Sequence, residues 1–291
     1  MIKLLALDLD GTLLDSRGEI SEINKKAIRR AEEKGVLVTI ATGRRFRDAL
    51  PVGLQMELNA PLITHNGALL KYAQTLETVA VSIVPKEIVS EILLIGRDFG
   101  ADAMISADPT GKGVLLYDRI SDENIPLQKY IAWSKRLHGA EAEEAVHHVE
   151  NLESVSEEIE TVHVSFSGAC ATMAHLEMIL RGELEQSATV LTTVYSKLDF
   201  TLIDILPSDA SKGIGVEKLA LLNNLSAENV MVMGDNFNDL EMLEYAGTSV
   251  LMGNASPELL ERPDFFSTLS NDENGVALAI EKFILGDFDG K

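Results

Sequence analysis

Short apolar runs alternate with amphipathic stretches at both ends of the chain. Runs of strand length occupy residues 4–9, 36–41 and 61–64, and helical spacing of apolar side chains or turn residues follows each of them. This order is typical of α/β domains, because parallel strands need a crossover between them. The sequence therefore predicts an α/β fold whose core is a Rossmann-like, doubly wound parallel sheet.

The regular alternation is interrupted in the middle of the chain. Between residues 85 and 193 the pattern indicates two or three helices interleaved with strands, which is an α+β arrangement. Regular alternation returns with an apolar strand at 198–206. We therefore expect one core domain, residues 1–83 and 195–291, interrupted by an inserted α+β domain, residues 84–194.

The charge balance excludes several classes of partner. The 291 residues include 46 Asp and Glu against 25 Lys and Arg, a net charge of −21. Such a surplus opposes binding to nucleic acid or to an anionic membrane surface. No apolar run is long enough to span a membrane, and Asp8 interrupts the apolar region that a signal peptide needs. The single Cys170 cannot form an intrachain disulfide, so we predict a cytoplasmic protein.

Two aspartates, Asp8 and Asp10, follow the first apolar run directly. Ligands of open α/β sheets bind at the carboxyl ends of the strands, which is where these side chains stand. Two carboxylates so close repel one another unless one is protonated or a cation balances them. The pair therefore predicts a hard divalent metal such as Mg²⁺, although an acidic turn after a strand would give the same sequence.

A second acidic cluster follows another apolar run, residues 230–233. It contains Asp235, Asn238 and Asp239. Asn238 or Asp239 could cap the following helix, and this structural interpretation is compatible with metal coordination by Asp235.

Two helix starts offer groups that suit a phosphate. Thr42 and Gly43 follow the run at 36–41, and a hydroxyl with backbone amides at a helix N-terminus can bind phosphate oxygens. Lys212 opens a predicted helix, where a cation is unfavourable beside the helix dipole unless it serves an anion. Together with the two acidic clusters, these groups would meet at the carboxyl ends of separate strands.

Taken in chain order, these motifs resemble the four motifs of the haloacid-dehalogenase-like phosphohydrolase superfamily. Segments 66–68 (Asn-Gly-Ala) and 252–255 (Met-Gly-Asn-Ala), with the long insertion, resemble its Cof-type branch, which carries a type IIB cap. The matching segments cover about residues 1–83 and 195–285. One departure is Asp209, which stands before the motif lysine where members often carry glycine; Asp tolerates a left-handed backbone better than most residues.

The resemblance implies roles for individual residues. Asp8 would attack phosphorus to form an aspartyl-phosphate, and Asp10 would act as general acid and base. Thr42 and Lys212 complete the catalytic set. Mg²⁺ would be held by the Asp8 carboxylate, the Asp10 backbone carbonyl and Asp235. The phosphoryl oxygens would be bound by the Leu9 and Gly43 amides, Thr42, Lys212 and Asn238, and Asp239 would orient Lys212 or a metal-bound water.

The function implied is Mg²⁺-dependent hydrolysis of a small phosphomonoester, of the sugar phosphate or cofactor phosphate class. A phosphosugar mutase on the same core is an alternative, as is a non-catalytic, phospho-accepting signalling protein. We expect a monomer or small homo-oligomer without nucleic-acid or membrane partners. The Glu-rich stretch 141–160 is interpreted as a solvated surface segment, because its acids show no ligand spacing.

Overall fold

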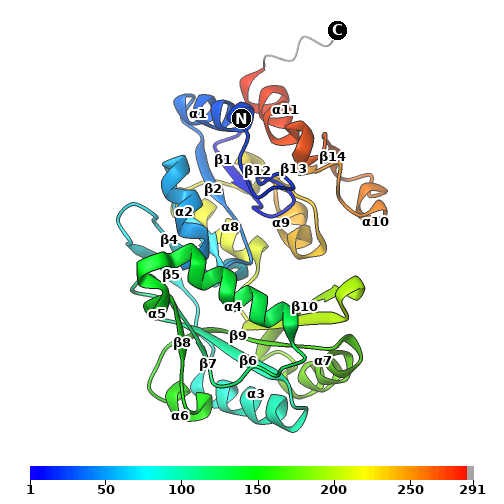
Figure 1. Cartoon of the computed structure of the whole chain (residues 1–291). Coiled ribbons are helices and arrows are strands. Elements are labelled where there is room, and N and C mark those ends of the chain that lie inside the picture. Colours follow the sequence, from blue (N-terminus) through cyan, green and yellow to red (C-terminus); the bar gives the residue numbers. More distant parts are fainter. Residues whose placement is uncertain (287–291) are drawn as a thin grey trace. The chain divides into compact units, whose positions relative to one another are not determined.

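The computed structural model describes residues 1–286, and the chain divides into two compact units, drawn in Figure 1. The first unit consists of Met1–Arg44, Ala49–Thr75 and the chain from Ser211 onward. The second consists of Arg45–Asp48 and Leu76–Ala210. The insertion expected at 84–194 lies inside the longer segment of the second unit.

A five-stranded parallel sheet forms the centre of the first unit, in the order β14-β13-β12-β1-β2. Its strands are β1 (Leu4–Leu7), β2 (Leu37–Ile40), β12 (Val230–Gly234), β13 (Thr248–Leu251) and β14 (Phe266–Ser267). All side chains of β1 and β12 are buried, as expected for strands covered on both faces. The predicted α/β fold with a parallel core sheet is confirmed.

The strand order reverses direction between β1 and β12. The chain adds β2 on one side of β1 and later adds β12, β13 and β14 on the other side. Because crossovers between parallel strands are right-handed, such a reversal distributes the connecting helices over both faces of the sheet. The amide of Asp8 donates to the Met233 carbonyl (2.9 Å), so the carboxyl ends of β1 and β12 lie side by side. The switch point of the sheet is therefore where the acidic motifs meet.

Helices and a short hairpin complete the first unit. The N-terminus of α1 is capped by the Ser21 side chain, which accepts from the Asn24 amide, and Ala27, Ile28 and Ala31 are buried at helical spacing. The elements are α1 (Glu22–Glu33), α2 (Phe46–Met56) from Ala49 onward, β3 (Leu62–Thr64), η1 (His65–Gly67), β4 (Leu69–Lys71), α8 (Lys212–Leu222), η4 (Ala227–Asn229), η5 (Phe237–Asp239), α9 (Leu240–Tyr245), α10 (Pro257–Leu260), η6 (Asn271–Glu273), α11 (Gly275–Ile280) and the π-helix η7 (Glu281–Leu285).

A six-stranded mixed sheet forms the centre of the second unit, in the order β10-β11-β9-β6-β7-β8. Its neighbours are antiparallel except for β7 and β8. The strands are β6 (Asp102–Ala107), β7 (Val114–Tyr117), β8 (Val146–His148), β9 (Thr161–Gly168), β10 (Ala188–Tyr195) and β11 (Phe200–Pro207). The unit also contains β5 (Thr78–Val81), η3 (Ser196–Leu198) and the first turn of α2 (Phe46–Met56).

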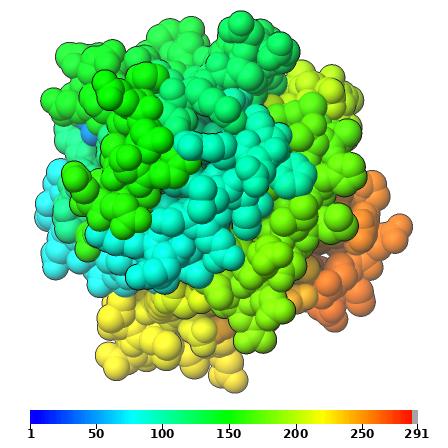
Figure 2. All heavy atoms as spheres, turned by 90° about the horizontal axis from the view of Figure 1, so that it is seen from below, coloured from blue at the N-terminus to red at the C-terminus, as the bar shows by residue number. Residues whose placement is uncertain are grey.

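Helices cover both faces of this sheet. The helices α3 (Lys86–Asp98) and α7 (Cys170–Leu184) pack on the face that carries Ile105 and Phe166. Figure 2 shows this side, with α3 in cyan beside α7 in yellow-green. The opposite face carries Met104 and Leu115 and packs against α4 (Ile125–His138). In β6, the neighbouring residues Met104 and Ile105 thus point to opposite faces of the sheet and belong to two different apolar clusters.

Two sequence interpretations need correction. The stretch 141–160 is more than a solvated segment, because it contains η2 (Gly139–Glu141), α5 (Ala142–Ala145), β8 and α6 (Leu152–Ser156), and it buries Ala145, Val146 and Leu152. The run 198–206 was grouped with the core, but β11 pairs with β10 and β9 in the inserted sheet. In residues 1–286, no helix has the length and apolar character that crossing a membrane would require.

Candidate active site

The buried Lys212 side chain lies between two carboxylates of the first unit. Its Nζ donates to Asp8 Oδ1 and to Asp239 Oδ1, both at 2.6 Å, and only 1% of the lysine side chain is exposed. Burial by itself would lower the pKa of Lys212, but the negative charges of Asp239 and Asp8 outweigh it and raise that pKa above its ordinary value. The lysine is therefore held as a cation.

The start of α8 explains the position of this lysine. The Ser211 side chain caps the helix by accepting from the Ile214 amide at 3.1 Å, and Lys212 is the first helical residue. The left-handed loop foreseen for Asp209 does not occur, because its φ is not positive. Instead, the Asp209 side chain accepts from the Ser82 hydroxyl at 2.8 Å.

Asp239 uses both carboxylate oxygens in fixed bonds. Its Oδ1 accepts from Lys212, and its Oδ2 accepts from the amides of Asp235 and Asn236, each at 3.0 Å. Gly234 lies so close that a Cβ there would be 2.6 Å from the Asp239 Cβ. This fully buried carboxylate is thus a fixed partner of Lys212 rather than a free ligand.

Three carboxylates are gathered at this point. One oxygen each of Asp8, Asp235 and Asp239 lies within 4.8 Å of the others. Burial first, and the charge of Asp239 second, raise the pKa of Asp8 well above its usual value and that of Asp235 to about 6. With Lys212 as the counter-charge, the cluster keeps an excess of negative charge. An all-oxygen donor set of this kind fits a hard divalent cation, and Asp8 and Asp235 retain oxygens that Lys212 does not occupy.

Gly11 and Thr12 follow Asp10 in the first acidic motif, and they form its contact with the second. The Thr12 hydroxyl donates to Asp235 Oδ1 at 3.2 Å. Gly11 has a φ of +81°, and a Cβ there would lie 2.4 Å from Asp235 Oδ2, so only glycine fits. The loop therefore brings the first motif into contact with Asp235.

Asp10 is arranged differently from Asp8. Its carboxylate is held by Arg44, whose Nε and Nη2 donate at 2.8 and 2.6 Å, and 59% of the Asp10 side chain is exposed. It is not one of the three gathered carboxylates. The metal contact expected through its backbone carbonyl, and its acid–base role, stay predictions.

The remaining expected phosphate ligands lie around the same strand ends. Thr42 is buried at the end of β2, where its hydroxyl accepts from the Arg44 amide at 3.1 Å, and Gly43 follows it. Leu9 is buried between the two motif aspartates, and Asn238 is exposed in η5. Asp239, one of the two residues expected as helix cap, stands at the N-cap position of α9 but makes no side-chain cap bond there, whereas Asn236 caps η5 by accepting from the Phe237 amide. Their contacts with a substrate stay predictions.

Asn254 is a site residue that sequence reasoning missed. Its Nδ2 donates to the Gly11 carbonyl at 2.8 Å and lies 3.5 Å from Asp235 Oδ2, while its Oδ1 accepts from the Asn271 amide. The available signal was its place in the segment 252–255, one of the motifs of the resemblance. Arg44 likewise stood in a motif without an assigned partner.

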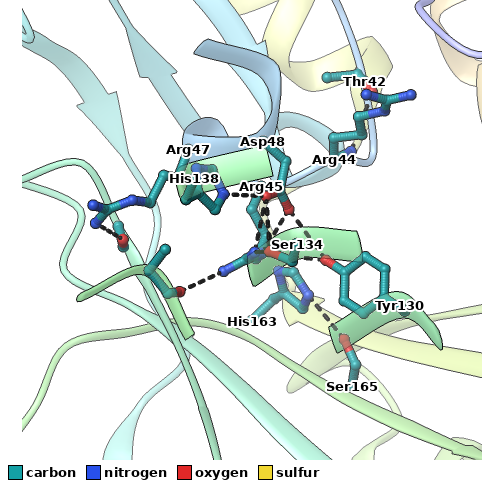
Figure 3. Close-up of polar contacts among 12 residues, drawn as sticks. Thr42, Arg44, Arg45, Arg47, Asp48, Tyr130, Ser134, His138, His163 and Ser165 are labelled. Atoms are coloured by element: carbon teal, nitrogen blue, oxygen red, sulfur yellow. Dashed lines mark hydrogen bonds and ion pairs between the residues drawn. The ribbon is translucent and has the colours of Figure 1, made fainter. Parts of the chain in front are cut away.

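A second buried ionic cluster lies in the second unit, shown in Figure 3. Arg45 Nε and Nη2 donate to Asp48 at 2.8 and 2.9 Å, and His138 Nε2 lies 2.9 Å from the same carboxylate. The Tyr130 and Ser134 hydroxyls complete the network at 3.1 and 3.4 Å from Asp48. Burial would raise the pKa of Asp48, but His138 and Arg45 outweigh it and lower that pKa to about 2. No sequence motif marked these residues.

The whole chain matches one protein family. A model of the haloacid dehalogenase-like hydrolase family covers residues 5–280, so the chain belongs to this family. The predicted Cof-type branch with its inserted cap is confirmed, as is the enzyme class, a phosphatase of this superfamily. The signalling alternative is therefore wrong.

Curated relatives and solved structures match this chain over nearly its full length. The 5-amino-6-(5-phospho-D-ribitylamino)uracil phosphatase YwtE of Bacillus subtilis (strain 168) is 30% identical over 304 residues, 99% of this chain and 100% of that protein. A haloacid dehalogenase-like hydrolase from Bacteroides thetaiotaomicron has a TM-score of 0.79 at 24% identity, covering 97% of this chain and 99% of that one. The HAD subclass IIB sugar phosphatase BT4131 has a TM-score of 0.74 at 20% identity, with 97% and 98% covered. These structures share the fold.

Proposed function

We propose that this protein hydrolyses a small phosphomonoester through an aspartyl-phosphate on Asp8, with Mg²⁺ as cofactor. The observation that carries the proposal is the gathering of Asp8 with Lys212 and two further carboxylates at the switch point of the sheet. Such an arrangement supplies a nucleophile together with the charges that phosphoryl transfer requires.

In the first step an oxygen of Asp8 forms a bond to phosphorus while the ester P–O bond breaks. The leaving oxygen takes up a proton from Asp10 and departs as an alcohol. For this step Asp10 must exchange its contact with Arg44 for the leaving oxygen, and the exposure of its side chain permits such a change.

In the second step water attacks the phosphorus of the aspartyl-phosphate. Asp10 accepts the proton of that water, the bond between phosphorus and the Asp8 oxygen breaks, and inorganic phosphate leaves. Asp8 returns to its ionised form and Asp10 to its protonated form, so protons and charges balance over the cycle.

Asp8, Asp235 and the backbone carbonyl of Asp10 would hold Mg²⁺. When bound, the ion supplies positive charge that balances the gathered carboxylates and polarises the phosphoryl group. Asp239 is left to position Lys212, because both of its oxygens already accept hydrogen bonds.

The phosphoryl oxygens would be bound by groups that converge from three strand ends. Lys212 contributes a permanent positive charge, which its two carboxylate partners stabilise. The hydroxyl of Thr42 and the amides of Gly43 and Leu9 provide neutral donors, and Asn238 provides an amide from η5.

The substrate class is proposed from the relatives. YwtE acts, by its name, on 5-amino-6-(5-phospho-D-ribitylamino)uracil, a small molecule with a phosphorylated polyol chain. We infer that the substrate of this chain is likewise a small sugar, polyol or cofactor phosphate. A screen of phosphate release over sugar phosphates, flavin mononucleotide, pyridoxal phosphate and the YwtE substrate would identify it.

The test of the mechanism is Asp8→Asn, which keeps the size of the side chain but removes the nucleophile. We expect the variant to fold and to release p-nitrophenol from p-nitrophenyl phosphate at least ~1,000-fold more slowly than wild type. Asp264→Asn, a change at an exposed carboxylate of the same unit, is the matched control and should keep full turnover. Wild-type turnover should stop in EDTA and return with Mg²⁺.

Three outcomes would count against the proposal. Turnover that persists in EDTA would show that the reaction needs no divalent metal. Unimpaired turnover in Asp8→Asn would show that Asp8 is not the nucleophile. An isomeric phosphate product without inorganic phosphate would favour the mutase alternative.

Asp235→Asn should need a higher Mg²⁺ concentration for half-maximal activity, which separates metal binding from chemistry.

A further inference from the structure

The turn His65–Gly67 of the first unit has an unusual backbone. His65, Asn66 and Gly67 all have positive φ, at 52°, 50° and 96°. Glycine adopts this region freely, whereas residues with a side chain, Asn and His included, do so at a cost in free energy. His65 and Asn66 are also buried, at 3% and 5% exposure. Strain of this kind is retained where the surrounding structure requires the conformation, and functional sites are frequent examples.

The turn holds the expected phosphate loop at both of its ends. The His65 amide donates to the Arg44 carbonyl at 2.9 Å, and the Asn66 amide donates to the Thr42 carbonyl at 3.0 Å. The two donors are consecutive residues with a left-handed backbone, and both bonds go to the same loop. The carbonyls on either side of Gly43 are thereby fixed.

The Asn66 side chain packs on Gly43 itself. A Cβ on Gly43 would lie 3.0 Å from Asn66 Oδ1 and 3.2 Å from Nδ2, so in either orientation of the amide a side chain at Gly43 would be crowded by Asn66. Within residues 1–286 no group donates a hydrogen bond to the buried Asn66 Oδ1. A buried acceptor without a donor is unfavourable for folding, so stability alone does not explain this asparagine.

The same turn touches the start of α8. A Cβ on Gly67 would lie 1.9 Å from the Ser211 carbonyl oxygen and 3.3 Å from the Lys212 amide nitrogen. Gly215, one turn further along α8, also lies close to Gly67, since a Cβ there would be 3.0 Å from the Gly67 Cα. The turn therefore lies against both the Thr42–Arg44 loop and the residue that carries the active-site lysine.

We propose that Asn66 is a positioning residue of the phosphate site: its side chain fixes Gly43, and the turn that it forms sets the distance between the Thr42–Arg44 loop and Lys212. The inference rests on the proposed function, because it assigns Gly43 and Lys212 to one phosphoryl group. Asn66 acts through these residues and is not itself placed on the substrate.

The test uses Asn66→Gly, which keeps the left-handed backbone and its N–H and removes the side chain. We expect a melting temperature near that of wild type and a fall in kcat/KM for p-nitrophenyl phosphate of about 100-fold. The competitive inhibition constant for inorganic phosphate should rise, because phosphate binds less tightly. Asn224→Gly is the matched control: Asn224 also has a positive φ, 57°, but is exposed at the far end of α8. It should keep the kinetics of wild type.

A double-mutant cycle tests the contact directly. Gly43→Ala places its methyl group against the Asn66 amide in the wild-type background but not in Asn66→Gly. We expect the loss of kcat/KM caused by Gly43→Ala to be at least tenfold smaller in the Asn66→Gly background than in wild type. Two additive losses would show that the side chains do not interact, and would overturn the inference.

Asn66→Asp serves if Asn66→Gly does not fold. It keeps the shape and the tolerance for positive φ, and it adds a negative charge beside the phosphate loop, so the inhibition constant for phosphate should rise at least tenfold. If wild type is active, and Asn66→Gly or Asn66→Asp keeps its kinetics and its inhibition by phosphate, the proposed role of Asn66 is overturned. A wild type that hydrolyses no phosphomonoester would instead overturn the proposed function.

Discussion

Asp8 and Asp48 are both buried carboxylates, but their surroundings change their pKa values in opposite directions. Burial and the neighbouring Asp239 raise the pKa of Asp8 despite the contact with Lys212. At Asp48, the contacts with His138 and Arg45 outweigh burial and lower the pKa to about 2. Asp8 is thus held in a cluster that costs stability, as is common at functional sites, whereas Asp48 belongs to a fully paired network.

Asp48→Asn should destabilise the protein in a pH-dependent way. The pKa of Asp48 is about 2 in the folded state against an ordinary 3.8, so its ionisation contributes about 2 kcal/mol of stability above pH 4. That contribution is lost as the pH falls from about 4 toward 2, because the unfolded chain then binds the proton first. The measurement is the free energy of unfolding in urea at pH 7, 5 and 3.

Comparing the free energy of unfolding of Asp48→Asn with that of wild type separates the titration of Asp48 from that of the other carboxylates. At pH 7 the variant should be less stable by about 3 kcal/mol, because Arg45 keeps a buried charge without its ionised partner. The difference should shrink by about 1 kcal/mol between pH 5 and pH 3. A difference that stays constant over this range would show that the Asp48 pKa is ordinary in the folded state.

At the scale of elements, the N-terminus of α8 combines a helix cap with an active-site group. Ser211 satisfies an amide of the first turn, and the residue that follows it places a lysine between two carboxylates. Gly213 allows close packing, since a Cβ there would lie 2.8 Å from the backbone of Glu241. Small residues along the helix thus fix its position against its neighbours.

Ser211→Ala should affect both stability and catalysis. Loss of the cap removes the acceptor of the Ile214 amide and costs about 1 kcal/mol, or about 2–4 °C in Tm. Because Lys212 is the next residue, kcat/KM should also fall, by about tenfold. Ser21→Ala, which removes the cap of α1 with its equal 3.1 Å bond, is the control and should lower Tm alone. Equal kinetics in the two variants would contradict the coupling.

Elements that coincide with an apolar run or a helical period were predictable from the sequence, and elements with neither were not. The buried strands β1 and β12 and the capped helix α1 follow directly from apolar runs and from Ser21. Elements such as α5, with four residues, or β14, with two, are too short for a hydrophobic period to define them. Of these residues only Ala145 is buried, and both residues of β14 are exposed, so burial gives no apolar pattern either.

Within the site, motif spacing could place residues at strand ends but could not give their bonds. The meeting of Asp8 with Asp235 followed from the topology of parallel strands. The saturation of Asp239, the pairing of Asp10 with Arg44 and the contact of Asn254 with Gly11 depend on side-chain directions that a single sequence does not contain. The same holds for the Arg45–Asp48 cluster, which joins residues about 90 positions apart.

At the scale of the whole molecule, the change of pattern along the chain revealed an insertion but not where its sheet ends. The expected boundary at 194/195 lies inside the β10–β11 hairpin, whose strands pair from Ala188 with Pro207 to Tyr195 with Phe200. An apolar run does not identify the strands with which it pairs, so the sequence could not assign β11 to either sheet. All expected site residues nevertheless lie in the first unit, within Met1–Arg44 and the chain from Ser211 onward.

The net charge of −21 sets a condition on how an anionic substrate reaches the site. The field of the whole molecule repels a phosphomonoester, while the local charges at Lys212 and a bound divalent cation attract it. Added salt screens charges more than ~10 Å apart at 0.1 M ionic strength, so it weakens the distant repulsion more than the local attraction. We expect kcat/KM for p-nitrophenyl phosphate, at constant free Mg²⁺, to stay level or rise between 10 and 200 mM NaCl, with Tm measured in parallel to exclude unfolding. A steep fall in kcat/KM at constant Tm would show that a positive field steers the substrate, and would contradict the local origin of the attraction.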